Sequence, residues 1–278
     1  MSRAMRTPFR KMHGLGNDFV VIDAREVPIA MSARRAAALA DRRTGIGCDQ
    51  LIVIEPSALA DVRMRIFNSD GSEVEACGNA SRAVGLLLGG TQSIETLGGL
   101  IRSEANAQGV SVDMGAPRLK WDEIPVAYAM DTLEMPVGWE ELENPAGVNV
   151  GNPHVIFFVA DADAVDLERL GPMIENDPLF PQRINVNIAS RIGPDHLKLR
   201  VWERGVGLTR ACGTGACATA VAAIRRKLTG RTVRVDLPGG PLTIAWPAGA
   251  GPEGGAIEMT GPAAFSFEGT FEDSEYPA

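Results

Sequence analysis

The segment LKLRVWERGVGLTRACG (residues 197–213) resembles an earlier segment of the same chain, VRMRIFNSDGSEVEACG (62–78). The two align without a gap at an offset of 135 positions, which places Cys212 over Cys77. Apolar and basic residues alternate in the same order in the first part of both segments. Self-similarity at so long a period indicates two halves built on one plan, and not a solenoid of short repeats.

The same offset holds at two further places in the chain. It places GNPHVIF (151–157) over GNDFVVI (16–22), and it places Asn185 over Gln50. Chance similarity between short apolar strings is the alternative explanation. Because three separated anchors share one offset, we interpret the similarity as an internal repeat.

Each half is predicted to combine strands and helices, so the fold class is α/β or α+β. The segment SARRAAALADRR (32–43) predicts a helix capped by Ser32, and further helices are expected after Cys77 and after Cys212. VRVDLPGGPLTIAW (233–246) predicts a hairpin around Pro-Gly-Gly. Apolar-rich segments predict strands at 17–23, 50–55, 62–67, 154–160 and 197–202.

Proline residues at 117 and 125 indicate the boundary between the halves. We expect an N-terminal half over 1–120, joined by the C-terminal segment 264–278. The C-terminal half is then expected over 121–263.

Composition bounds the class of protein. The 278 residues are 45% apolar and 22% charged, which is typical of a globular domain in water. The net charge of −8 argues against a nucleic-acid or anionic-membrane partner. The basic N-terminal residues lack the apolar run of a signal peptide, and no apolar stretch is long enough to span a bilayer. These features predict a cytoplasmic location, where thiols stay reduced.

The cysteine pattern does not favour a metal site. No CxxC pair occurs, and the histidines lie far from the cysteines in sequence, so we expect no bound metal. The residues in question are Cys48, Cys77, Cys212 and Cys217, with His13, His154 and His196.

Cys77 and Cys212 each precede a glycine at a predicted helix start. The unpaired N–H groups of a first helical turn bind anions, including carboxylates. They also favour thiolate over thiol, so we expect a pKa below the usual value for a cysteine in this position. The alternative is that each thiol is a small buried apolar group. Two matched cysteines favour the functional interpretation.

Two equivalent thiols suit a reaction that inverts a stereocentre. One thiolate removes a proton from carbon, and the opposite thiol delivers a proton to the other face. Helix N–H groups aimed at an α-carboxylate would stabilise the carbanion. A disulfide oxidoreductase is the competing interpretation, but the CxxC pattern is absent.

The assembled motifs resemble the diaminopimelate epimerase family over nearly the whole chain. The resemblance implies two pseudo-symmetric halves, each a mixed sheet around a central helix, with the active site in the cleft between them. It implies an enzyme without pyridoxal phosphate, metal or other cofactor that interconverts LL- and meso-2,6-diaminopimelate for lysine and peptidoglycan synthesis. The matching segments are KMHGLGNDFVVID (11–23), TGIGCDQLIVIEP (44–56), NSDGSEVEACGNASRA (68–83), GNPHVIFFV (151–159), RINVN (183–187) and ERGVGLTRACGTGACA (203–218).

By the same resemblance, Cys77 and Cys212 are the acid/base pair. Cys212 removes the proton from the LL substrate and Cys77 returns one, while His154 and Glu203 tune the thiols. Substrate is the small-molecule partner, and a homodimer is expected. The implied substrate ligands are Asn17, Gln50, Asn68, Gly78, Asn79, Asn152, Asn185, Glu203, Arg204, Gly213 and Thr214.

Three positions depart from the family pattern. Ala80 stands where the family generally has glycine, Ala83 where a cysteine often follows the arginine, and Cys48 at a small-residue position. Ala80 puts a methyl group near the helix start.

Three other functions remain open at this point. A proline or hydroxyproline racemase would share the thiol pair but needs an apolar slot for a ring. A non-catalytic amino-acid-binding protein would tolerate the loss of a thiol. A redox sensor would pair Cys77 with Cys212 in a disulfide. The many amide side chains and Arg204 favour a longer polar substrate.

Overall fold

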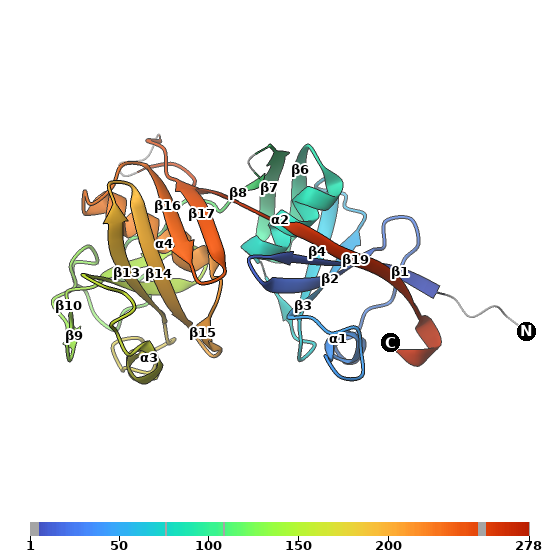
Figure 1. The fold of residues 1–278 in the computed structure, drawn as a ribbon, viewed down its shortest axis with the longest axis horizontal. Coiled ribbons are helices and arrows are strands. Elements are labelled where there is room, and N and C mark those ends of the chain that lie inside the picture. Colours follow the sequence, from blue (N-terminus) through green and yellow to red (C-terminus); the bar gives the residue numbers. More distant parts are fainter. Residues whose placement is uncertain (1–5, 76, 108, 250–253, 278) are drawn as a thin grey trace, which may run out of the picture. The chain divides into compact units, whose positions relative to one another are not determined.

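The computed structural model describes residues 6–75, 77–107, 109–249 and 254–277. The chain divides into two compact units, Met1–Val112 with Gly261–Ala278 and Asp113–Thr260 (Figure 1). The boundaries expected from the sequence, at 120/121 and 263/264, stay a prediction about which segments fold as separate domains.

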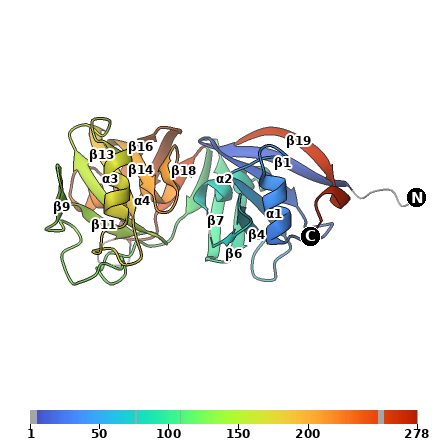
Figure 2. The same ribbon diagram turned by 90° about the horizontal axis from the view of Figure 1, so that it is seen from below.

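The first unit is a mixed sheet with two helices. β1 pairs antiparallel with β2 and with β19, and β2 runs parallel to β3. β3 pairs antiparallel with β4, which runs parallel to β6. Figures 1 and 2 both show β1 and β19 side by side along this unit. The elements are β1 (Arg6–Gly14), β2 (Asn17–Asp23), α1 (Ala33–Ala40), β3 (Gln50–Glu55), β4 (Val62–Asn68), β5 (Glu73–Val74), α2 (Gly78–Leu88), β6 (Thr91–Thr96), β7 (Gly99–Asn106), β8 (Gly109–Asp113), β19 (Ala264–Glu272) and the 3₁₀ turn η1 (Asp273–Glu275).

The second unit repeats this plan. β12 runs parallel to β13, β13 pairs antiparallel with β14, and β14 runs parallel to β16. Its elements are β9 (Gly138–Trp139), β10 (Leu142–Glu143), β11 (Ala146–Asn149), β12 (Pro153–Val159), α3 (Leu167–Glu175), β13 (Asn185–Gly193), β14 (His196–Glu203), β15 (Gly207–Thr209), α4 (Gly213–Arg225), β16 (Thr232–Leu237), β17 (Gly240–Ala245) and β18 (Glu258–Gly261).

Strand register confirms the internal repeat. Phe19 pairs with Gln50 across β2 and β3, and His154 pairs with Asn185 across β12 and β13. Both members of the second pair lie 135 positions after the first. Because a slip of one residue would turn every side chain to the opposite face, equal register places equivalent side chains on equivalent faces.

Each face of the first sheet carries one helix. Alternate strand residues face opposite sides. Val20 packs in the same apolar cluster as Leu39 of α1, while Phe19 and Val21 pack with Ala83 of α2. The two helices therefore cover the two faces of β2 and its neighbours, and α2 also contacts β1, β6 and β7.

The central helix of the second unit is α4, which contacts β11 to β14, β16 and β17 (Figure 1). Its residues from Ala216 to Ala223 are all buried. Five of these eight are alanine, and such small side chains let strands approach the helix from several sides. Among the described residues, no helix is long and apolar enough to cross a lipid bilayer.

All five expected strands are confirmed within one residue at each end, and the hairpin at 233–246 is formed by β16 and β17. Helix α1 begins after Ser32, whose hydroxyl accepts from the Arg35 N–H, as expected. It ends at Ala40, three residues before the predicted end. Asp41 adopts an extended backbone, and its carboxylate accepts from the N–H groups of the next turn, which stops the helix.

Candidate functional site

The predicted site residues form two groups, one in each unit. Within each unit they lie where two parallel strands begin, where the next antiparallel strand ends, and where the central helix starts. The topology brings these four points to one edge of a sheet, because parallel strands share their starting edge and an antiparallel neighbour ends there. The first group is Asn17, Gln50, Asn68, Cys77, Gly78 and Asn79; the second is Asn152, His154, Asn185, Glu203, Arg204, Cys212, Gly213 and Thr214.

A Gly-Asn turn precedes β2 and another precedes β12. Gly16 has a φ of 88° and Gly151 a φ of 105°, which L side chains rarely adopt. A Cβ atom at either position would meet no other heavy atom within 4 Å, so glycine is needed for backbone conformation and not for space. The repeated turn puts Asn17 and Asn152 at equivalent places.

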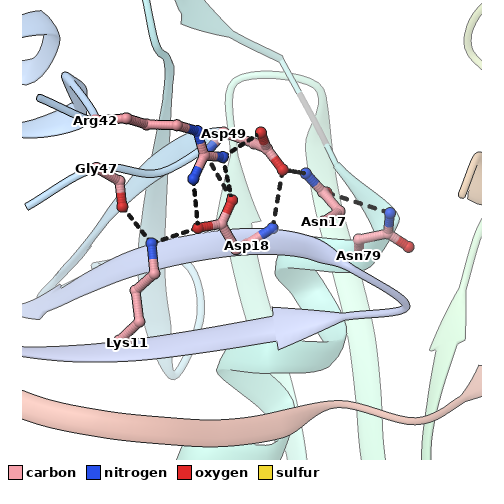
Figure 3. Close-up of polar contacts among 7 residues, drawn as sticks. All are labelled: Lys11, Asn17, Asp18, Arg42, Gly47, Asp49 and Asn79. Atoms are coloured by element: carbon pink, nitrogen blue, oxygen red, sulfur yellow. Dashed lines mark hydrogen bonds and ion pairs between the residues drawn. The ribbon is translucent and has the colours of Figure 1, made fainter. Parts of the chain in front are cut away.

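Directional hydrogen bonds fix the amides of Asn17 and Asn79 in the first group (Figure 3). The buried Arg82 guanidinium donates to Asn79 Oδ1 at 2.7 Å, and Asn79 Nδ2 donates to Asn17 Oδ1 at 3.2 Å. Asn17 Nδ2 in turn donates to Asp49 Oδ2 at 3.1 Å. This series of hydrogen bonds starts at a guanidinium, which can donate but not accept, and ends at a carboxylate, which can only accept. The nitrogen and oxygen of neither amide can therefore exchange places. Each amide nitrogen has a second hydrogen that these two bonds do not use.

An ionic cluster holds Asp49 in place (Figure 3). Arg42 Nη2 donates to Asp49 Oδ1 at 2.7 Å and to Asp18 Oδ1 at 2.6 Å. Lys11 contacts Asp18 and the Gly47 carbonyl. Burial would raise the pKa of Asp18, but hydrogen bonds from Arg42 and Lys11 hold that pKa well below its usual value.

Asp18→Asn is expected to lower the free energy of unfolding at pH 7 by about 2 kcal/mol, since it removes charge-assisted hydrogen bonds to Arg42 and Lys11. A carboxyl whose pKa is depressed on folding stabilises the protein above its unfolded pKa, near 3.8. The difference between variant and wild type should therefore shrink as pH falls below that value. Urea denaturation at pH 7 and at pH 3 checks this. A difference that grows on acidification would contradict the cluster's role.

Gln50 and Asn68 contact one another. Gln50 Nε2 donates to Asn68 Oδ1 at 3.1 Å, and Asn68 Nδ2 donates to Ser72 Oγ at 3.2 Å. Within the described part of the chain, the buried Gln50 Oε1 has no hydrogen-bond partner. A buried acceptor without a partner costs free energy unless a ligand supplies a donor. This oxygen suits an ammonium group.

Cys212 is the N-cap residue of α4 and is buried. The Gly215 N–H donates to its sulfur at 3.3 Å, and Thr214 Oγ1 lies 3.5 Å from the sulfur. A Cβ atom at residue 215 would lie 3.2 Å from that sulfur, so glycine there lets the amide approach. The first turn of α4 is built around the thiol, as the sequence predicted.

The pKa of Cys212 differs from the expectation. Burial raises the pKa well above the usual value, and the neighbouring Glu203 carboxylate raises it further. Hydrogen bonds from Thr214 and Gly215 lower the pKa, as a helix start should, but they do not offset burial and the negative charge. Cys212 is therefore a protonated thiol at neutral pH in this structure.

Glu203 lies at the end of β14 beside this thiol. Burial raises the pKa of its carboxyl, while hydrogen bonds from Thr209 and Cys212 lower it, and the net direction is upward. Thr209 Oγ1 donates to Glu203 Oε1 at 2.6 Å. The thiol of Cys212 donates to the same carboxylate, so Glu203 is placed to hold or exchange its proton.

Cys77 occupies the matching position in the first unit. It is the N-cap residue of α2, half-buried, with the same extended backbone as Cys212. The methyl groups of Ala80 and Ala83 are fully buried in the apolar cluster on this side of the sheet, which accommodates both family departures. Cys48 is buried in the opposite cluster, and burial raises its pKa to about 11.

Asn185 fixes the backbone of the second group at two points. Asn185 Nδ2 donates to the Pro153 carbonyl at 2.8 Å, and Asn185 Oδ1 accepts from the Arg204 N–H at 2.9 Å. His154 is fully buried, and burial lowers its pKa to about 4. The Arg204 guanidinium donates to the Gln182 carbonyl and borders a hollow of about 470 Å³ that lies within this unit.

Among the residues with described placement, no group of three His, Cys, Asp or Glu side chains could hold a metal ion. Cys212 and His154 instead contact amide, hydroxyl and carboxylate groups. These contacts suit proton transfer and the binding of charged small molecules.

The sequence did not reveal the residues that hydrogen-bond to the predicted ligands. Asp49 directly precedes Gln50 in the family motif, and its contact with Asn17 was unforeseen. Asn187 lies two residues after Asn185 in RINVN, and the period of two along a strand could have placed both on one face. Nothing in the sequence pattern signals that Arg42 reaches Asp18.

The chain matches a known protein family over most of its length. A model of the family described as diaminopimelate epimerase matches residues 9–120 and 147–266. A protein of Erythrobacter litoralis named diaminopimelate epimerase is 66% identical over 273 residues, which cover 98% of this chain and 100% of that protein.

Solved structures with lower identity share the fold. A phenazine biosynthesis protein of the PhzF family from Bacillus anthracis superposes with a TM-score of 0.69 at 15% identity, covering 96% of this chain and 99% of that one. A hydroxyproline epimerase from Agrobacterium vitis gives 0.65 at 15% identity, covering 98% and 92%. At this identity the likeness concerns the fold alone.

Proposed function

Because this chain belongs to the diaminopimelate epimerase family, we propose that Cys77 and Cys212 are the two thiols that epimerise its substrate. The chain is an isomerase that interconverts LL- and meso-2,6-diaminopimelate, a step toward lysine. The observation that carries the thiol assignment is their equivalence: each is the N-cap residue of the central helix of its unit, at the same position of the repeat.

Proton transfer runs between these thiols and one α-carbon. The thiolate of one cysteine takes the α-proton, and the thiol of the other delivers a proton to the opposite face, so the two exchange protonation states. The N–H groups at Gly78, Asn79, Gly213 and Thr214 belong to first helical turns and would stabilise negative charge on the α-carboxylate.

Because Cys212 is a protonated thiol without substrate, the substrate itself helps to form the thiolate. The Glu203 carboxylate raises the pKa of Cys212. An ammonium group bound at Glu203 would neutralise that charge and lower the barrier to forming the thiolate. Cys212 then removes the α-proton of the LL substrate and Cys77 returns one to the opposite face.

The two groups of side chains include partners for the two ammonium groups and the two carboxylates of diaminopimelate. Oxygen atoms of Glu203 and Gln50 suit ammonium groups, while the guanidinium of Arg204 and the amide hydrogens of Asn17 suit carboxylates. We propose the remaining members of both groups as ligands of the same substrate. The enzyme is proposed to work in the cytoplasm as a homodimer, without cofactor and away from nucleic acid and membrane.

The test is an assay without added cofactor in heavy water. LL-diaminopimelate should be converted to the meso form, and early in the reaction the product should carry one deuterium, at the inverted α-carbon. L-Proline should be left unchanged under the same conditions. Turnover of proline but not of diaminopimelate, or a product without deuterium, would contradict the proposal.

A further inference from the structure

The side chain of Asn187 in β13 makes three hydrogen-bond contacts in the interior of the second unit. It is fully buried, and its Nδ2 donates to the Gly215 carbonyl and to Thr219 Oγ1, both at 3.1 Å. Its Oδ1 lies 3.3 Å from His154 Nδ1. Since Gly215 belongs to the first turn of α4, Asn187 joins the helix that carries Cys212 to the imidazole.

The orientation of Asn187 follows from its partners. A backbone carbonyl can accept but not donate, so the group that faces Gly215 must be the amide nitrogen. Reversing the carboxamide would set two carbonyl oxygens against each other in a buried place. Oδ1 therefore faces His154, and His154 Nδ1 must carry a hydrogen to donate to it.

The second ring nitrogen is then an acceptor. Burial lowers the pKa of His154 to about 4, and the charge of Arg204 also lowers it, so the ring carries one proton at neutral pH. With that proton on Nδ1, Nε2 is unprotonated. The side-chain oxygen of Asn152 lies 3.0 Å from Nε2, and two acceptors at that distance repel. Half a rotation of the Asn152 carboxamide puts its nitrogen there instead.

We propose that Asn187 is a positioning residue that holds His154 as the Nδ1–H tautomer and thereby turns Asn152 so that its nitrogen donates to Nε2. The side-chain oxygen of Asn152 is then free to accept from an ammonium group. This last step rests on the proposed function, in which Asn152 is a substrate ligand. Without Asn187, the imidazole can protonate at either nitrogen and Asn152 loses its fixed orientation.

The tautomer can be read from the full-length wild-type protein at pH 7. With ¹⁵N-labelled histidine, two-bond correlations from the ring hydrogens distinguish Nδ1 from Nε2. The loss of one set in His154→Gln assigns His154 among the three histidines. We expect a protonated Nδ1 and an unprotonated Nε2. A hydrogen on Nε2, in the neutral ring or in an imidazolium, would overturn the inference. This readout needs no substrate, so it does not depend on epimerase activity.

Two variants test whether Asn187 is the cause. Asn187→Leu keeps a similar volume but removes the acceptor, so His154 should no longer be held as the Nδ1–H form. The KM for LL-diaminopimelate should rise about tenfold, with a smaller change in kcat. Thr219→Val is the matched control, because it removes one partner of Asn187 and leaves the Gly215 carbonyl. The control should keep the tautomer and change KM less than about twofold. An unchanged tautomer and KM in Asn187→Leu would overturn the inference.

Discussion

Cys212→Ser is expected to lower kcat/KM for the conversion of LL- to meso-diaminopimelate by about 10³–10⁴-fold, and Cys77→Ser by a similar factor. A serine hydroxyl is a far weaker acid than a thiol, so the variant can neither form the base nor deliver a proton quickly. The hydroxyl can still accept from the Gly215 N–H, which keeps the start of α4 intact. Steady-state rates in both directions measure the effect.

The other two cysteines provide matched controls. Cys217 lies on the same helix as Cys212, and Cys48 is buried beside α1. Cys217→Ala and Cys48→Ala should change kcat/KM less than about threefold, since alanine suits both apolar places. Turnover near the wild-type rate in Cys77→Ser or Cys212→Ser would refute the assignment of the acid/base pair, whatever the controls show.

The internal repeat could be predicted from the sequence because it depends on local patterns of residues. Strand residues show their alternation directly, and one offset relates equivalent positions in both halves. The offset also predicts register, since Phe19 and His154 face equivalent partners. Helix α1 was predicted too long because Asp41 caps the following turn, and its side chain competes with the helix for backbone N–H groups.

The protonation of Cys212 could not be read from its neighbours in the sequence. A helix start lowers a thiol pKa through local N–H groups, and the motif shows these. Burial and the charge of Glu203 act in the opposite direction, and both depend on how β14 packs against α4. Contacts over long sequence separation, such as Arg42 with Asp18 and Asn187 with His154, were missed for the same reason.

Glu203→Gln is expected to lower kcat/KM by about 10²-fold or more, because it removes the proposed carboxylate ligand of the substrate ammonium group. The same change should lower the pKa of Cys212, since the carboxylate of Glu203 raises it. Thiolate is the form that reacts with iodoacetamide. The pH profile for alkylation of Cys212, followed on its own peptide by mass spectrometry without substrate, should therefore move to lower pH in the variant.

Thr209→Val tests whether the charge of Glu203 or its hydrogen-bonded position sets the pKa of Cys212. It removes the hydrogen bond to Glu203 Oε1 but leaves the carboxylate, so Cys212 should keep its raised pKa and its alkylation profile. If Glu203 acts through its charge, Glu203→Gln alone shifts the profile, and its lost activity accompanies a more reactive thiol. A profile that stays in place or moves to higher pH in Glu203→Gln would show that burial alone sets the pKa of Cys212. Glu203 would then be a substrate ligand without influence on the thiol.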